Sequence, residues 1–152
     1  SPYNAENICF GKKLSESEVQ DALNRSAAYF VKRTKEGIHM QVGSRGNLVS
    51  GGERQRISLA RALALPRRLF IFDEATSALD SETEAEVLNT VMQLSGVATV
   101  IIIAHRFSAV KHADLILVME EGKIIEQGDW EALNLEGTRF HSFLKLQSMN
   151  SK

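Results

Sequence analysis

The chain has 152 residues, with 18 basic and 19 acidic side chains and a formal net charge of −1. This length suits one domain with a hydrophobic core, and the near-neutral charge excludes a general nucleic-acid binder and an acidic tail. The single cysteine, Cys9, excludes an internal disulfide framework, which favours a reducing compartment.

No secretory signal peptide opens the chain, and the longest apolar run, Val97 to Ala104, is too short to cross a bilayer as a helix. We therefore expect the chain as it stands to be soluble. Cys9 lies between apolar neighbours and is expected to be a buried or half-buried small hydrophobe.

The first fifty residues predict helices and loops. Ser15 and Glu18 have the spacing of a capping box, and a helical apolar pattern follows them. A second helical piece is expected in "AAYFVKRTKEG", ending at Gly37. The stretch "GIHMQVGSRGN", which has three glycines, is expected to be a loop.

A charged helix is predicted from Glu53 to Leu65, stopped by Pro66, and Gly51 and Gly52 stand directly before it. The free N–H groups of a helix start favour an anion, and glycine lets a bulky anion approach the backbone. A glycine-containing turn that merely precedes a helix is the alternative.

The rest of the chain alternates strands and helices. "LFIF", Leu69 to Phe72, and "ATVIIIA" have the apolar composition of buried parallel strands. Between them, Ser81 and Glu84 have capping-box spacing and predict a helix to about Leu94. This alternation indicates an α/β domain with a partly parallel sheet.

After the second strand, a short helix is expected around Ser108 to His112. "DLILVM" and "KIIEQG" flank a Glu-Glu-Gly turn and predict an antiparallel hairpin. Asp129 is expected to cap a short helix, and a last amphipathic helix is predicted around Phe140 to Gln147.

Asp73, Glu74 and His105 follow the two predicted parallel strands. Because ligands bind at the carboxyl ends of strands in open α/β sheets, these residues are the candidate site. Taken singly, an Asp-Glu pair after a strand or a histidine at a strand end can be structural.

"LVSGGERQRISLARALALPRRLFIFDEATSALD" resembles the core of an ATP-binding cassette (ABC) ATPase. Val49 to Glu53 resemble the signature motif, and "LFIFDE" resembles the Walker B strand with its following glutamate. "SALD", at Ser77 to Asp80, resembles the loop at the dimer interface, and "IIIAHR" places His105 at the switch histidine. The motifs have the family's order and spacing, and the resemblance covers essentially the whole chain.

The resemblance implies ATP and Mg²⁺ as cofactors and a role for each matched residue. Asp73 would hold Mg²⁺ through water, Glu74 would activate the attacking water, and His105 would bond the terminal phosphate. The signature would contact ATP held by a partner subunit, through Ser50, Gly51, Gly52 and Glu53. The dimer interface would include Ser77, Ala78, Leu79 and Asp80.

Glu53 departs from the family, whose signature most often ends in glutamine. A carboxylate facing phosphate would be repulsive, so we expect Glu53 to turn aside, towards Arg54, Arg56 or another base. Arg54, Arg56 and Arg61 are expected to form a solvated or salt-bridged face rather than a nucleic-acid patch.

The phosphate loop G-x-x-x-x-G-K-[ST] is absent from the sequence. Gly46 and Gly51 have the correct separation, but Gly52 stands where lysine is required. The chain therefore resembles the C-terminal part of one nucleotide-binding domain. About residues 1–65 would be the helical signature subdomain and about 66–152 the Walker B part, and this piece is expected to be inactive alone.

"AENICFG" resembles a segment of exporter-type cassettes, and "QVGSRG" resembles their loop that contacts the membrane domain; a plain surface turn is the alternative for that loop. The resemblance implies an ATPase that powers export, at the cytoplasmic face of the membrane. Its partners would be a second nucleotide-binding domain and a transmembrane domain, with no nucleic acid. The alternatives are a soluble ABC-type ATPase of DNA repair or chromosome maintenance and a non-catalytic half-cassette that only binds.

Overall fold

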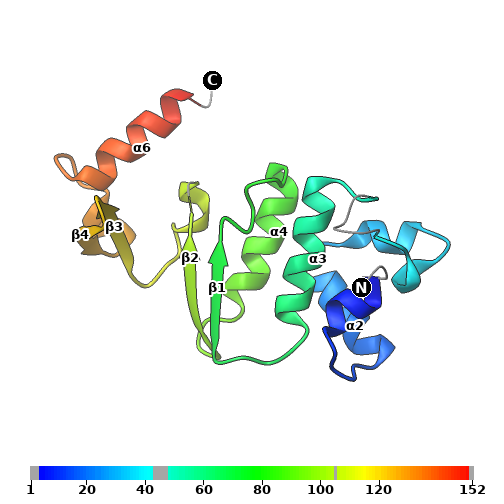
Figure 1. Cartoon of the computed structure of the whole chain (residues 1–152). Helices are drawn as coiled ribbons and strands as arrows, with labels where there is room; N and C mark the ends of the chain where they lie inside the picture. The colour runs from blue at the N-terminus through cyan, green and yellow to red at the C-terminus, as the bar shows by residue number, and fades with distance from the viewer. Residues whose placement is uncertain (1–3, 43–47, 105, 151–152) are drawn as a thin grey trace. The chain divides into compact units, whose positions relative to one another are not determined.

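The computed structural model describes residues 4–42, 48–104 and 106–150. The chain divides into two compact units after Ile103. The first unit has helices packed on one face of a parallel strand pair, and the second has a hairpin followed by helices (Figure 1). This composition confirms the α/β class.

Short helices make up the start of the first unit. They are α1 (Asn4–Cys9), α2 (Glu16–Arg25) and the 3₁₀ helices η1 (Tyr29–Arg33) and η2 (Gly37–His39). The capping box of α2 is confirmed, because Ser15 accepts from the Glu18 N–H while the Glu18 carboxylate accepts from the Ser15 N–H. Cys9 is half-buried, as expected.

The helical piece expected to end at Gly37 is instead the 3₁₀ helix η1, which ends at Arg33, and η2 lies within the stretch that we expected to be a loop. Thr34 has an extended backbone, and its hydroxyl donates to the carbonyl of Val31 at 2.9 Å. The Val31 carbonyl, which also accepts from the Thr34 N–H at 3.3 Å, is therefore satisfied locally at the end of η1. Gly37, with φ +51°, then begins the second 3₁₀ helix rather than ending the first.

The longest helix of the first unit is α3 (Gly51–Leu63), which begins two residues earlier than predicted. Ser50 is its N-cap, and Ser50 and Glu53 form a capping box. Ile57, Ala60 and Leu63 are buried as the pattern predicted. The two glycines are therefore the first two residues of the helix, not a turn before it.

Two of the three expected surface arginines of α3 stack on aromatic rings. The guanidinium of Arg56 lies 5.3 Å from the ring centre of Phe30, and that of Arg61 lies 5.3 Å from the ring centre of Phe10. The Nε of Arg56 is buried and lacks a hydrogen-bond partner within the described ranges. Arg56 therefore belongs to the packing of α3 on the preceding helices.

Strands β1 (Leu69–Asp73) and β2 (Thr99–Ile103) pair in parallel, and α4 (Ser81–Met92) connects them. The register runs from Leu69 opposite Thr99 to Asp73 opposite Ile103. Both strands therefore end at the same edge, as the sequence predicted. α3 and α4 lie together beside these strands (Figure 1).

Burial alternates along both strands, so the prediction of fully buried strands is wrong for this chain. On one face, the rings of Phe70 and Phe72 stack in a core with residues of α3 and α4. The other face carries exposed aliphatic side chains, with exposed fractions of 49% for Leu69, 61% for Ile71, 46% for Ile101 and 49% for Ile103. We call these four residues the open sheet face; their exposure shows that the described residues leave it largely uncovered.

The predicted capping box of α4 is also wrong. The N-cap is Asp80, whose carboxylate accepts from the N–H of Thr83 at 3.0 Å and from its hydroxyl at 2.8 Å. Because Asp80 caps one residue before Ser81, Glu84 is not placed at the third helical position and instead turns inward, with 6% exposure.

The second unit contains the predicted antiparallel hairpin, formed by β3 (Ile116–Glu120) and β4 (Lys123–Gly128). Asp129 caps α5 (Trp130–Leu133), as predicted, and α6 (Arg139–Asn150) follows. The short helix expected near Ser108 is the 3₁₀ helix η4 (Phe107–Ala109). The core of this unit is built on Ile116, Val118, Leu133 and Phe140.

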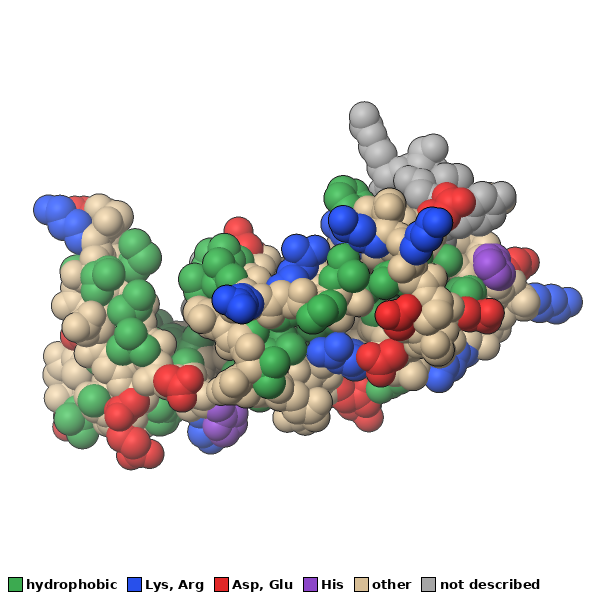
Figure 2. Space-filling model, turned by 90° about the horizontal axis from the view of Figure 1, so that it is seen from below, with side chains coloured by type: hydrophobic (Ala, Val, Ile, Leu, Met, Phe, Trp, Pro, Cys, Tyr) green, Lys and Arg blue, Asp and Glu red, His purple; other side chains and the backbone are tan. Residues whose placement is uncertain are grey.

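The surface carries no broad region of one charge in the view of Figure 2, where basic and acidic side chains are interspersed. Among the described residues, no helix combines the length and apolar character needed to cross a membrane.

Candidate functional site

The start of α3 carries the residues predicted to contact phosphate. The Ser50 hydroxyl accepts from the Glu53 N–H at 3.3 Å, and the Glu53 carboxylate accepts from the Ser50 N–H at 2.8 Å. We expected a basic side chain to draw Glu53 aside, and the structure gives it the backbone of Ser50 as a partner. Arg54 donates to the carbonyl of Val49 at 2.8 Å.

The two glycines of the helix start have different surroundings. Among the described residues, a Cβ on Gly51 would meet only the end of the Arg54 side chain, at 3.8 Å. A Cβ on Gly52 would lie 3.0 Å from the carbonyl oxygen of Ala78. Gly52 therefore lets α3 pack against the segment after β1, whereas the described ranges place no close neighbour beside Gly51 other than Arg54.

The carboxylates Asp73 and Glu74 lie at the carboxyl end of β1, and both are exposed. The Glu74 N–H donates to the carbonyl of Ile103 at 2.9 Å, so the pairing with β2 continues one residue past the strand. Glu74 has φ +48°, the left-handed region that costs free energy for a residue with a side chain. The Ser77 N–H donates to the Glu74 carbonyl at 3.0 Å and closes a turn.

Gln55 is a site residue that the sequence reasoning missed. Its amide nitrogen donates to the Glu74 carbonyl at 2.8 Å and lies 3.3 Å from the Ser77 hydroxyl. Its amide oxygen accepts from the Ala78 N–H at 3.1 Å. The available signal was helical spacing, because Gln55 lies three residues after Gly52 and so on the same side of α3.

Glu84 was also missed as a contact of this segment. Its buried carboxylate accepts from the Thr76 hydroxyl at 3.1 Å. Of the residues predicted for the dimer interface, Ser77, Ala78 and Asp80 are exposed, whereas Leu79 is buried in the core. We call residues 74–80 the carboxylate loop; Gln55 contacts it from α3 and Glu84 from α4.

The structure thus brings the start of α3 together with the carboxylate loop, and places Asp73 and Glu74 next to each other. His105 lies outside the described residues, as does most of the "QVGSRG" loop, from Gly43.

The predicted Mg²⁺ site needs only one carboxylate from this chain, that of Asp73. No group of three His, Cys, Asp or Glu side chains able to hold a metal is found among the described residues. Mg²⁺ is usually bound by one or two carboxylates together with phosphate oxygens and water. The exposed carboxylate of Asp73, at a strand end, suits this mode of binding.

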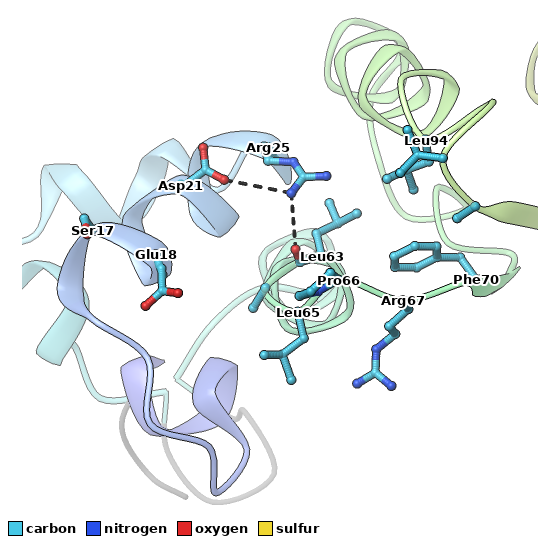
Figure 3. Close-up of a pocket in the computed structure, with 13 residues that line it drawn as sticks. Ser17, Glu18, Asp21, Arg25, Leu63, Leu65, Pro66, Arg67, Phe70 and Leu94 are labelled. Atoms are coloured by element: carbon cyan, nitrogen blue, oxygen red, sulfur yellow. Dashed lines mark hydrogen bonds and ion pairs between the residues drawn. The ribbon is translucent and has the colours of Figure 1, made fainter.

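A groove of ≈ 510 Å³ lies at the opposite end of β1 (Figure 3). It is lined by α2, the end of α3 and the segment that leads to Phe70. Arg25 crosses it, donating to the carbonyl of Leu63 at 3.3 Å and lying 3.9 Å from Asp21. Since Asp73 is at the other end of the strand, this groove is separate from the candidate site.

Comparison with known proteins identifies the family. A family model described as "ABC transporter" matches residues 4–77. The chain is 49% identical over 134 residues to an ATP-dependent lipid A-core flippase of Francisella novicida, covering 86% of this chain and 23% of the flippase. It is 45% identical over 146 residues to a beta-(1→2)glucan export ATP-binding/permease protein of Agrobacterium fabrum, covering 95% of this chain and 25% of that protein.

The fold matches a solved structure described as a bacterial Atm1-family ABC exporter with ATP bound. The TM-score is 0.89 at 36% identity, over 96% of this chain and 26% of that chain. The chain thus spans about a quarter of the length of the proteins it matches. Sequence and fold comparisons agree, and the chain belongs to the ABC transporter family.

Proposed function

We propose that this chain is part of the ATP-binding and ATP-hydrolysing module of an ABC exporter. The observation that carries the proposal is the exposed pair Asp73 and Glu74 at the end of β1, on a loop that packs against the glycine-containing start of α3. A phosphate-binding helix start beside a carboxylate pair is an arrangement suited to phosphoryl transfer, which depends on positioning and charge neutralisation.

Each residue has a distinct role in this proposal. Asp73 holds Mg²⁺, which neutralises phosphate charge when bound. Glu74 accepts a proton from the attacking water, and His105 donates a hydrogen bond to the terminal phosphate. Ser50 and the N–H groups of Gly51 and Gly52 approach ATP held by a second nucleotide-binding domain. The capping box keeps the Glu53 carboxylate on the Ser50 backbone.

The partners follow from the same proposal. A second nucleotide-binding domain would contact the exposed residues Ser77, Ala78 and Asp80, and buried Leu79 would anchor their loop to the core. A transmembrane domain completes the exporter and places the module at the cytoplasmic face of the membrane. The names of the relatives, a flippase and an export permease, support this assignment.

The two relatives are named for chemically different cargoes, lipid A-core and a glucan, although their identities to this chain are close, at 49% and 45%. The matched region therefore supports the ATP-driven step that such proteins share.

The test is Glu74→Gln in the full-length protein that contains this chain. We expect ATP binding to persist while the hydrolysis rate falls by roughly 10²-fold or more, the usual contribution of a general base. Glu82→Gln, which changes an exposed carboxylate of α4, is the matched control and should leave the rate unchanged. Near-normal turnover by Glu74→Gln would reject Glu74 as the base.

A further inference from the structure

The amide of Gln55 bridges α3 and the carboxylate loop through both of its ends. Nε2 donates to the Glu74 carbonyl at 2.8 Å, and a second contact of 3.3 Å joins it to the Ser77 hydroxyl. Oε1 accepts from the Ala78 N–H at 3.1 Å. The Gln55 amide therefore acts as donor and acceptor at once. Its partners lie 19 to 23 residues further along the chain.

No other side chain of similar size offers the same combination at this reach. Glutamate keeps the acceptor but has no donor for the Glu74 carbonyl, and lysine keeps a donor but has no acceptor for the Ala78 N–H. Asparagine has both groups on a side chain one methylene shorter. The site therefore selects the chemistry of glutamine at both ends.

The contact to Glu74 matters because of that residue's backbone. Its φ of +48° is unfavourable for a residue with a side chain and persists only where several contacts hold it. Ile103 holds the N–H of Glu74, and Gln55 and Ser77 hold its carbonyl. Loss of the Gln55 contact removes one of the two hydrogen bonds that hold this carbonyl and so weakens the hold on the backbone that directs the carboxylate.

We propose that Gln55 is a positioning residue that fixes the backbone of Glu74 and so aims its carboxylate at the water it activates. This inference rests on the proposed function, since it concerns the same carboxylate. Gln55 does not need to touch nucleotide in this role. It acts through Glu74 and lies on the helix whose start is the proposed phosphate contact.

The first experiment tests the bridge in the 152-residue chain, by hydrogen exchange measured with NMR. In Gln55→Ala, the Ala78 amide loses its acceptor and should exchange roughly 2- to 10-fold faster, the factor expected for one hydrogen bond. In Gln55→Glu, the acceptor remains and the rate should stay near that of the wild type. Gln20→Ala, the same change on α2, is the control and should leave the Ala78 amide unaffected. Unchanged exchange in Gln55→Ala would overturn the bridge.

The second experiment measures ATP hydrolysis by the full-length protein. Gln55→Ala and Gln55→Glu should both lower kcat by about 10-fold or more, the effect of a misplaced base, with KM for ATP unchanged. Gln20→Ala should change neither. If kcat stays at the wild-type value, or if KM rises while kcat is kept, the positioning role is wrong.

The third experiment separates positioning from a general structural defect. If Gln55 acts through Glu74, adding Gln55→Ala to Glu74→Gln should lower kcat no further. A further loss of similar size would overturn the proposal. Failure of the proposed function is distinguishable, because it would show as near-normal turnover by Glu74→Gln alone, whatever the result for Gln55.

Discussion

The Cβ that Gly52 lacks would stand 3.0 Å from the carbonyl oxygen of Ala78, tighter than side-chain carbons normally pack. This glycine therefore has a function within its own chain, which is to let α3 approach the carboxylate loop. Within the described part of the chain, a Cβ on the neighbouring Gly51 would meet no comparable contact. The sequence reasoning gave both glycines one role, the approach of phosphate, and the structure separates them.

Alanine substitutions should separate the two glycines in unfolding experiments. Gly51→Ala should leave stability unchanged or raise it by up to about 1 kcal/mol, because alanine is the better helix former. Gly52→Ala should be less stable than Gly51→Ala by about 1–3 kcal/mol, since the Ala78 carbonyl must move. Urea denaturation of the two variants measures the difference. Equal denaturation midpoints for the two variants would show that a Cβ at position 52 does not destabilise the fold through its contact with the Ala78 carbonyl.

Gly51→Ala also isolates the proposed phosphate contact. Because the added methyl group would meet only the Arg54 side chain among the residues that the structure describes, folding should be preserved while the space for a phosphate at the helix start is reduced. In the complete nucleotide-binding domain, without the transmembrane domain, we expect ATP-dependent dimerisation to weaken, as seen by size-exclusion chromatography. Wild-type association by this variant would remove Gly51 from the phosphate contact.

The stacking of Arg56 on Phe30 should appear as a coupling free energy. Cation–π pairs contribute about 0.5–1 kcal/mol when exposed and about 2 kcal/mol when desolvated, and Arg56 is partly buried. Arg56→Met, Phe30→Leu and the double variant form a thermodynamic cycle in urea. Additive effects would mean that the 5.3 Å contact does not stabilise the fold.

The cap of α4 predicts a pH dependence. Hydrogen bonds from the Thr83 backbone N–H and then from its hydroxyl hold the pKa of Asp80 below its usual value of 3.8. A carboxyl whose folded pKa is lowered stabilises the fold above the unfolded pKa and loses that contribution as pH falls through the folded value. Stability should therefore decrease less below about pH 4 in Asp80→Ser, which keeps a capping hydroxyl but does not titrate. Urea midpoints at neutral and acidic pH test this, and parallel curves would contradict it.

The 152-residue chain alone should bind Mg-ATP no tighter than about millimolar, roughly 4 kcal/mol. Its sequence has no phosphate loop, so the β-phosphate lacks the cradle of amides and the lysine that such loops supply. The carboxylates of Asp73 and Glu74 repel a polyphosphate unless Mg²⁺ bridges the carboxylates and the phosphates. Calorimetry is the measurement, and micromolar binding would reveal a phosphate site that the motifs do not account for.

Local sequence patterns predicted the helix starts well where no second capping residue stood next to the first. Ser15 and Ser81 both stand three residues before a glutamate, yet only Ser15 forms the capping box. Asp80 precedes Ser81 and is itself a strong N-cap, so the helix begins one residue earlier. Asp80 and Ser81 are N-cap residues of similar strength, so the free energies of the two possible helix starts are close. The sequence pattern alone therefore cannot decide which of them caps the helix.

The site was predictable in part. The positions of Asp73 and Glu74 at a strand end followed from the apolar run before them, and the structure has them there. Gln55 was not predictable in the same way, because its partners are 19 to 23 residues away and depend on how α3 packs. The residues of β1 and β2 do not by themselves predict the open sheet face, because apolar side chains occupy both faces of these strands whether or not both faces are covered.

The open sheet face also bears on the electrostatics of Asp73. Alternation along β1 puts the Asp73 side chain on the same face as Leu69 and Ile71, at the rim of an aliphatic surface. Any element that covers this surface in the full-length protein displaces water from around the carboxylate. An effective dielectric constant of about 20 in place of about 80 strengthens the attraction between two charges about fourfold. The burial of four aliphatic side chains would thus strengthen the attraction between Asp73 and a divalent cation without any new ligand, and this gain opposes the cost of removing the two charges from water.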